Sequence, residues 1–184
     1  MCSRSETERN KITHHDSFIN IKNIYILMKN IKLGQSKKRL MNQEIRILNT
    51  AGLVVIKEGK ILLAFSGNKK AWYLPGGKID SGETSHQAIQ REIDEELNIK
   101  MNPELLTFYC HITAPAFGEE NNLVMEQDCF IYDLTEKIAA SNEIDEVGYF
   151  DLETYLKEPA QVPGVLTLFT KLQEDGLLKS VLSS

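Results

Sequence analysis

Three glutamates, Glu92, Glu95 and Glu96, stand at positions i, i+3 and i+4, so that they would share one face of a helix within about one turn. Like charges at this spacing repel each other, and Asp94 and Glu83 add negative charge nearby. A bound cation would relieve this repulsion. Carboxylate oxygens are the ligands that hard divalent ions prefer, and Mg²⁺ combines a few of them with water and substrate phosphates. The pattern therefore predicts a magnesium site.

The same segment contains the helix that would hold these acids. Thr84 or Ser85 would cap its first turn, and Asn98 is placed to end it, because Asn tolerates the left-handed conformation. The opposite face carries the apolar residues of a buried stripe, which are Ala88, Ile89, Ile93 and Leu97. The helix is therefore expected to pack inward and to present its acids outward.

A glycine turn, Pro75-Gly76-Gly77, precedes this helix. Glycines let the backbone approach a ligand closely, since they carry no side chain and accept unusual φ values. A carbonyl oxygen of this turn would be placed to complete the coordination of the ion.

The segment that follows Pro75 resembles the Nudix box, written G-x5-E-x7-R-E-U-x-E-E-x-G-U, where U is an aliphatic residue. Asn98 stands where the family has Gly, and both residue types accept a positive φ. The resemblance covers residues 74–99 by motif and about 44–178 by the pattern of elements. The matching residues are Gly77, Glu83, Arg91, Glu92, Ile93, Glu95, Glu96 and Ile99.

Membership of this family would imply an α/β (α+β) fold, an α/β/α sandwich with a mixed central sheet. It also implies Mg²⁺-dependent hydrolysis of a nucleoside diphosphate linked to another moiety, with Mn²⁺ as a substitute. Carried over by position, Glu92, Glu95 and Glu96 would ligate the metal together with the Gly76 carbonyl. Glu92 or a neighbour such as Glu95 would also serve as the catalytic base.

Two further residues of the box have implied supporting roles. Arg91 would pair with Glu83 and hold the loop against the helix, and Gly77 would shape the turn. These roles are structural rather than chemical.

Members of the family often recruit another acid from beyond the box. Glu143 is our prediction for this catalytic acid, because it begins a segment that resembles E-x-x-E followed by an aromatic residue. Glu126 and Glu146 are the alternatives, and an exposed acidic turn is the competing interpretation.

Two residues near the motif are candidates for substrate contacts. Lys78 would contact a phosphate, although a solvated lysine is the alternative. Phe117 lies in a long polar loop, residues 113–122, and would stack on a base or fold back onto the core.

The remaining segments predict the scaffold. Apolar residues within 45–56 and 61–65 indicate a hairpin of buried strands, and an amphipathic helix is expected around Val165 to Leu172. Strands around one helix, with another helix at the end, predict a mixed sheet between helices. Further strands are expected at 72–74, 105–112, 123–133 and 143–150.

Length and composition favour one domain. The 184 residues are 42% hydrophobic and 26% charged, enough to bury a substantial single core. We expect the domain to span residues 41–184 and residues 1–40, which are polar and basic, to form a flexible extension. The apolar patch at 24–28 is too short to span a membrane, and no signal-peptide cleavage site follows it.

Charge and cysteine content limit the partners and the location. A net charge of -5 argues against a general nucleic-acid binder but allows a small nucleotide substrate. Three cysteines without a Cys-x-x-Cys motif indicate free thiols in a reducing compartment. We therefore expect a cytoplasmic protein, monomeric or homodimeric, with no membrane or nucleic-acid polymer as partner.

The sequence is compatible with several substrates and with two other functions. Pro115 falls sixteen positions after Ile99, a placement associated in the family with ADP-ribose hydrolysis, whereas the overall size resembles MutT-type nucleoside triphosphate pyrophosphohydrolases. One alternative is a Nudix module that senses a nucleotide without cleaving it. Another is an isoprenyl-diphosphate isomerase, which would need a catalytic cysteine such as Cys110 or Cys129.

Overall fold

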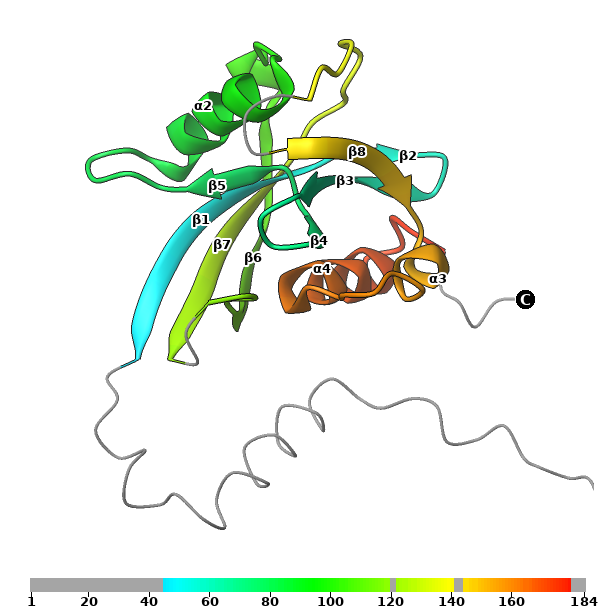
Figure 1. The fold of residues 1–184 in the computed structure, drawn as a ribbon. Coiled ribbons are helices and arrows are strands. Elements are labelled where there is room, and N and C mark those ends of the chain that lie inside the picture. Colours follow the sequence, from blue (N-terminus) through cyan, green and yellow to red (C-terminus); the bar gives the residue numbers. More distant parts are fainter. Residues whose placement is uncertain (1–44, 120–121, 141–143, 180–184) are drawn as a thin grey trace, which may run out of the picture. The chain divides into compact units, whose positions relative to one another are not determined.

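The computed structural model describes residues 45–119, 122–140 and 144–179, which belong to one compact unit, Glu44–Ser184. Within it, helix α2 lies on one side of the strands, and α3 and α4 lie on the other (Figure 1). The extension predicted at residues 1–40 lies outside the described residues. In the part of the chain that is described, no helix is long and apolar enough to cross a membrane.

The first sheet contains four strands in the order β5 (Gly76–Lys78), β1 (Arg46–Val54), β7 (Leu123–Ile131) and β6 (Thr107–Pro115). The sheet is mixed, because β1 runs parallel to β7 while β5 and β6 are antiparallel to their neighbours.

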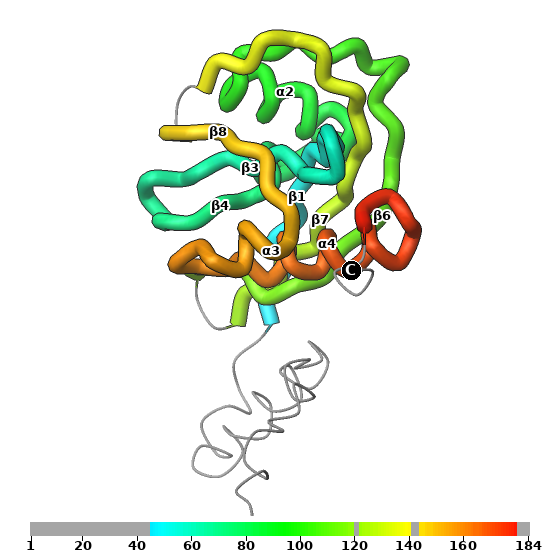
Figure 2. Tube along the Cα trace, turned by 90° about the vertical axis from the view of Figure 1, so that its right-hand side faces the viewer, coloured from blue at the N-terminus to red at the C-terminus, as the bar shows by residue number. Residues whose placement is uncertain are grey.

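A second sheet contains β2 (Ile56–Lys57), β3 (Lys60–Ser66), β4 (Ala71–Tyr73) and β8 (Ile144–Phe150), all paired antiparallel. Figure 2 shows β8, β3 and β4 side by side, with α2 above them and α3 below.

The predicted hairpin is present but shorter than its apolar run. Glu58 (φ 52°) and Gly59 (φ 75°) form the two-residue turn between β2 and β3. Two successive positive φ values are typical of a type I′ turn, whose twist suits antiparallel strands. The run Leu53–Ile56, however, is divided, because β1 ends at Val54 in the first sheet and β2 begins at Ile56 in the second. The chain changes sheets at this point.

Helix α2 (Ser85–Leu97) begins and ends as its sequence predicts. The Thr84 hydroxyl accepts a hydrogen bond from the Gln87 N–H, and the Gln87 side chain accepts one from the Thr84 N–H, which forms a capping box. Asn98 ends the helix in the left-handed conformation, at φ 54° and ψ 44°. The predicted stripe is buried, and its members are Ala88, Ile89, Ile93 and Leu97.

The C-terminal elements cover the other side of the strands. Asp151 caps the short helix α3 (Leu152–Tyr155), and its carboxylate accepts a hydrogen bond from the Thr154 N–H at 2.7 Å. Helix α4 (Pro163–Glu174) packs against β6, and a single 3-10 turn, η2 (Pro103–Leu105), leads into that strand. The apolar face of α4 consists of Gly164, Val165, Leu168, Phe169 and Leu172.

Two apolar cores result, one on each face of the first sheet. Successive residues of a strand point to opposite faces, so Leu53 packs with α2 while Val54 packs with α4. The mixed α/β architecture expected from the sequence is confirmed, with its strands divided between two sheets.

Candidate active site

The glycine turn lies against β1 and beneath α2. Gly76 has a φ of 126°, and a Cβ at this position would collide with the carbonyl oxygen of Ala51. At Gly77 a Cβ would lie 2.5 Å from Cδ of Glu92. Position 76 therefore requires glycine because of its backbone conformation and the Ala51 carbonyl, whereas a side chain at position 77 would displace the Glu92 carboxylate.

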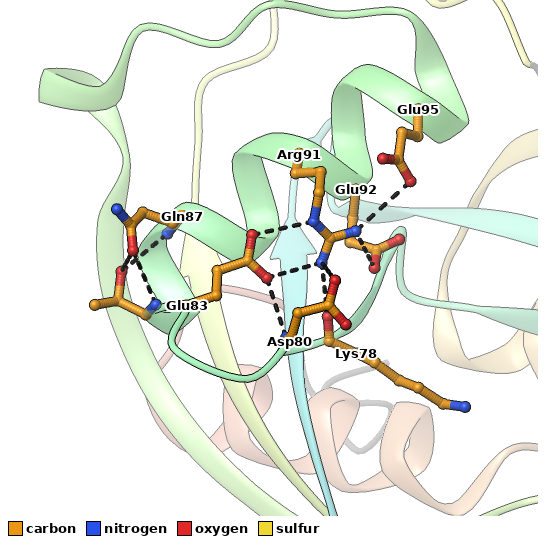
Figure 3. Close-up of polar contacts among 8 residues, drawn as sticks. Lys78, Asp80, Glu83, Gln87, Arg91, Glu92 and Glu95 are labelled. Atoms are coloured by element: carbon orange, nitrogen blue, oxygen red, sulfur yellow. Dashed lines mark hydrogen bonds and ion pairs between the residues drawn. The ribbon is translucent and has the colours of Figure 1, made fainter.

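Arg91 connects the acidic loop to the helix (Figure 3). Its Nε donates to Glu83 Oε1 at 3.0 Å and its Nη2 to Glu83 Oε2 at 2.9 Å, a bidentate pair. Nη2 also donates to the backbone oxygen of Lys78 at 2.9 Å, and Nη1 donates to Glu92 Oε1 at 2.8 Å. Nη1 lies 3.6 Å from Glu95 Oε2 as well. One guanidinium thus holds the loop, the strand β5 and two acids of the helix.

These contacts shift the titration of both partners. Hydrogen bonds from Arg91, and a further one from the Asp80 N–H, lower the pKa of Glu83 below its ordinary value. Hydrogen bonds to Glu83 and Glu92 raise the pKa of Arg91, which keeps it charged. The pair is therefore ionic at neutral pH.

Glu96 holds the helix to the glycine turn by a separate contact. Its Oε2 accepts a hydrogen bond from the Gly76 N–H at 2.8 Å. Since Gly76 also pairs with Gly52 of β1, the position of this carboxylate is tied to the first sheet.

A cavity of about 580 Å³ lies beside this turn. Part of its charged lining comes from β5, the loop after it and α2, and includes Lys78, Asp80, Glu92, Glu95 and Glu96. Lys69 and Glu119, an ion pair at 3.1 Å, add charged residues from other loops. Its apolar and aromatic lining comes from other elements, and includes Leu48, Tyr73, Phe117, Met125, Val162 and Val165. A ligand with both charged and flat or apolar groups would match this lining.

Most of the residues predicted for the site line this one cavity. They are Gly76, Gly77, Lys78, Glu92, Glu95, Glu96 and Phe117. Glu83 and Arg91 lie next to it, through the contacts to Lys78 and Glu92. Phe117 packs edge to face with Tyr73, with ring centroids 6.2 Å apart, so it both contacts the core and faces the cavity.

The acids proposed from beyond the box fall in different places. Glu143 lies outside the described residues. Glu126 accepts a hydrogen bond from Thr113 at 2.7 Å and contacts His111, on the face of β7 opposite to Gln127. Glu146 lines a second cavity, together with Trp72 and Lys70. Neither alternative acid accompanies the box carboxylates in the structure.

The donors of the site are of the kind that a divalent metal needs, but they are engaged with other groups. Within residues 45–119, 122–140 and 144–179, no three His, Cys, Asp or Glu side chains converge as metal ligands. Arg91 binds Glu92 and Glu95 instead, and Gly76 binds Glu96. The donor set fits in kind, because three carboxylates and the Gly76 carbonyl belong to residues of one cavity wall. Binding would require Glu92 and Glu95 to turn away from Arg91.

The sequence did not identify several polar residues of the cavity, among them Thr50, Tyr73 and Gln127. Thr50 and Gln127 are buried, with 6% and 8% of their surfaces exposed. Thr50 follows Asn49, and Gln127 lies between Glu126 and Asp128, so neither interrupts an apolar run. The only available signal was the position of each residue in the alternation of its strand. The sequence could not show that both face the same cavity as the glutamates.

Comparison with known proteins gives three kinds of match. The NUDIX domain profile matches residues 46–169. A MutT-like protein of Streptomyces ambofaciens is 33% identical over 60 residues, covering 33% of this chain and 39% of that protein. An 8-oxo-dGTP diphosphatase of Haemophilus influenzae is 43% identical over 60 residues, covering 30% of this chain and 44% of that protein. The chain thus spans less than half the length of these relatives.

Solved structures are similar over a larger part of the chain. The MutT protein from Methanosarcina mazei superimposes with a TM-score of 0.61 and 20% identity, over 73% of this chain and 98% of that one. A bifunctional NMN adenylyltransferase/ADP ribose pyrophosphatase from Francisella tularensis, complexed with AMP and a Mn ion, gives 0.55 and 23% identity. It covers 84% of this chain and 47% of that one. At these identities the likeness shows a shared fold.

Proposed function

The chain belongs to the NUDIX domain family, and from that premise we propose that it is a Nudix hydrolase that cleaves a diphosphate linkage in a nucleoside diphosphate derivative. The observation that carries this proposal is the cavity wall on which Glu92, Glu95 and Glu96 meet the glycine turn. All four glutamates of the box are present, these three and Glu83. The apolar and aromatic lining across from them would accommodate the rest of a nucleotide.

Mg²⁺, or Mn²⁺ in its place, would be held by Glu92, Glu95, Glu96 and the Gly76 carbonyl. When bound, such an ion neutralises phosphate charge and makes a coordinated water more acidic. A diphosphate resists attack by water because its oxygens are negatively charged, so positive charge beside it is essential. The protein supplies some of this charge itself, since Lys78 lines the cavity with an ammonium group.

Proton transfer would fall to a carboxylate of the same wall. Glu92 or Glu95 is proposed to accept the proton of the attacking water, and Glu143 to assist from beyond the box. Arg91 is proposed to position Glu92 rather than to react, because it also contacts Glu83 and the Lys78 backbone. Gly77 leaves the space that the Glu92 carboxylate fills.

The other two functions have less support in the structure. An isoprenyl-diphosphate isomerase would need a cysteine near the reacting atoms, but Cys110 and Cys129 are buried in the core that packs against α4. A sensing module that does not cleave its ligand would have no need of all four box carboxylates.

The substrate is proposed only as a class. The relatives with matching segments include an 8-oxo-dGTP diphosphatase and an RNA pyrophosphohydrolase from Aeromonas hydrophila, and one similar structure is that of an ADP ribose pyrophosphatase. Nucleoside triphosphates, ADP-ribose and sugar nucleotides are therefore all in scope. Pro115 lines the cavity but does not choose between them.

A substrate panel would test the proposal. The full chain would be incubated with Mg²⁺ and nucleoside triphosphates, ADP-ribose, dinucleotides or sugar nucleotides, with release of phosphate, diphosphate and nucleoside monophosphate measured. We expect metal-dependent release from at least one of these compounds. Tight binding with no release from any of them would favour the sensing module.

We also propose a cytoplasmic location and a monomer or homodimer. The free thiols of Cys110 and Cys129, which face each other across β6 and β7, support a reducing compartment.

A further inference from the structure

Gln127 is a buried amide on the sheet side of the cavity. It belongs to the middle of β7, only 8% of its surface is exposed, and it lines the cavity. The one hydrogen bond that its side chain makes among the described residues is a weak one, from Cys129 Sγ to Oε1 at 4.0 Å. A buried primary amide carries two N–H donors and two acceptor sites, so most of its capacity is unused.

The neighbouring strand makes room for this amide. A Cβ on Gly52 of β1 would lie 3.0 Å from both Cδ and Nε2 of Gln127, closer than an ordinary contact. Gly52 has no positive φ that would call for glycine. Glycine in the interior of a strand weakens it and often marks a close approach of another group. Here the group that approaches is the amide of Gln127.

Gln127 also stands in line with the charged part of the site. In the first sheet, Lys78 is paired with Thr50, and Thr50 is paired with Gln127. Directly paired residues project their side chains from the same face, and all three residues line the cavity. Two strand spacings, about 10 Å in all, therefore separate the Lys78 backbone from that of Gln127. A nucleoside monophosphate reaches across such a span from phosphate to base.

We propose that the Gln127 amide binds the nucleobase edge of the substrate, at the end of a row that begins with phosphate at Lys78. The inference rests on the proposed function and adds the group that reads the base. An amide offers a donor beside an acceptor, the combination that pairs in bidentate fashion with a base such as adenine. Gly52 allows the amide to take this position, because it has no side chain to occupy the same space.

Binding to the full chain tests this inference separately from turnover. The probes are AMP, GMP, CMP and UMP, with ribose 5-phosphate as the probe that lacks a base, each titrated with Mg²⁺ by calorimetry. For Gln127→Leu we expect affinity to fall about tenfold or more for at least one nucleotide. Affinity for ribose 5-phosphate should stay within about twofold. Gln173→Leu is the matched control, because Gln173 bonds the Lys179 backbone outside the cavity.

A second variant guards against a folding defect. Gly52→Ala keeps the amide but forces it to move, and it should reproduce the selective loss for the same nucleotide. Equal weakening of nucleotides and ribose 5-phosphate, no weakening of either, or no nucleotide binding to the wild-type chain would each overturn the inference. If a nucleotide binds through Gln127 but nothing in the substrate panel is cleaved, the proposed hydrolase activity fails and this inference survives.

Discussion

Arg91 grips both carboxylate oxygens of Glu83, with Nε to Oε1 at 3.0 Å and Nη2 to Oε2 at 2.9 Å. Glu83 also accepts the Asp80 N–H at 3.1 Å, so one carboxylate joins the loop before α2 to the helix itself. The same guanidinium contacts Glu92 in the site. The geometry of the proposed catalytic acids therefore depends on a pair that does not itself line the cavity.

Replacing Glu83 by Gln should lower stability in a manner that depends on pH. The pKa of Glu83 is lowered in the folded protein, mainly by Arg91, so ionised Glu83 stabilises the fold above its ordinary value near 4.5. This contribution is lost as the pH falls through the folded pKa. Between pH 3 and pH 7, the melting temperature of the wild type should exceed that of Glu83→Gln at neutral pH. The two melting temperatures should converge at acidic pH. A difference in melting temperature that stayed constant over this pH range would contradict the stabilising role of ionised Glu83.

The two glycines of the turn should respond differently to alanine. Gly76→Ala places a Cβ on a residue with a φ of 126° and against the Ala51 carbonyl oxygen. Because this oxygen belongs to the backbone and cannot move easily, the melting temperature should fall sharply. Gly77→Ala meets only the carboxylate of Glu92, the end of a flexible side chain. It should stay folded while activity falls, because that carboxylate must move.

Thermal melts and turnover measured on both glycine variants decide this prediction. Gly59→Asn is the control, since Gly59 (φ 75°) has nothing near its Cβ direction and Asn tolerates this conformation. Equal loss of stability at Gly76 and Gly77 would show that the two contacts do not differ as described.

Activity should require a divalent metal and Glu95. Chelation should abolish turnover, and Mg²⁺ or Mn²⁺ should restore it. Glu95→Gln should reduce kcat about 100-fold or more, because the residue would lose both a metal ligand and a candidate base. Glu126→Gln is the matched control, since Glu126 bonds Thr113 and His111 on the other face of β7. Equal losses in the two variants would remove the distinction on which the site rests.

The local structure around the motif was predictable because its causes are local. The Thr84 cap, the buried stripe from Ala88 to Leu97 and the left-handed Asn98 all follow from residue type and helical spacing. Arg91 lies in the second turn of α2 and Glu83 lies just before the helix. Their pairing was predicted from the resemblance to the family motif. The cap, the buried stripe and the end of the helix can therefore be recognised in a single sequence.

Relations across the sheets were not predictable in the same way. Val54 and Ile56 are two residues apart in one apolar run, and nothing in their type shows that they belong to different sheets. Lys78 and Gln127 share a row only because β1 lies between β5 and β7. Strand order is set by long-range packing, so the sheet side of the cavity was not predictable while its acidic wall was.

The contribution of His111 to the stability of the fold should decrease as the pH rises. Its Nδ1 lies 2.8 Å from Asp128 Oδ1 and its Nε2 2.5 Å from Glu126 Oε2. Hydrogen bonds to Asp128 and then Glu126 raise the pKa of His111 above its ordinary value of 6.5. Protonated His111 thus stabilises the fold fully below pH 6.5, and the contribution is lost as the pH passes the folded pKa. Melting temperatures of wild type and His111→Asn should differ at pH 6 and approach each other by pH 9.

Tyr155, which is buried, and Tyr73, which is half-buried, should respond differently to loss of the hydroxyl group. Tyr155 is fully buried, its hydroxyl donates to the Trp72 carbonyl at 3.2 Å, and it accepts the Val162 N–H at 2.8 Å. Tyr155→Phe leaves both backbone groups unpaired between β4 and the start of α4, so unfolding should become easier by about 1–3 kcal/mol. The Tyr73 hydroxyl, by contrast, is buried without a hydrogen-bond partner among the described residues. Tyr73→Phe should therefore leave stability unchanged or raise it, because a desolvated group is removed.

Urea unfolding of the two phenylalanine variants and the wild type measures this difference in the free energy of unfolding. The dependence of that free energy on urea concentration should be the same in all three proteins. The variants match in chemistry and remove one oxygen each, so the contrast isolates the hydrogen bonds. If Tyr73→Phe cost as much as Tyr155→Phe, the Tyr73 hydroxyl would have a partner in solution. The aromatic wall of the cavity would then be held in place by a polar contact, and Tyr73 would share with Tyr155 the role of joining β4 to its surroundings.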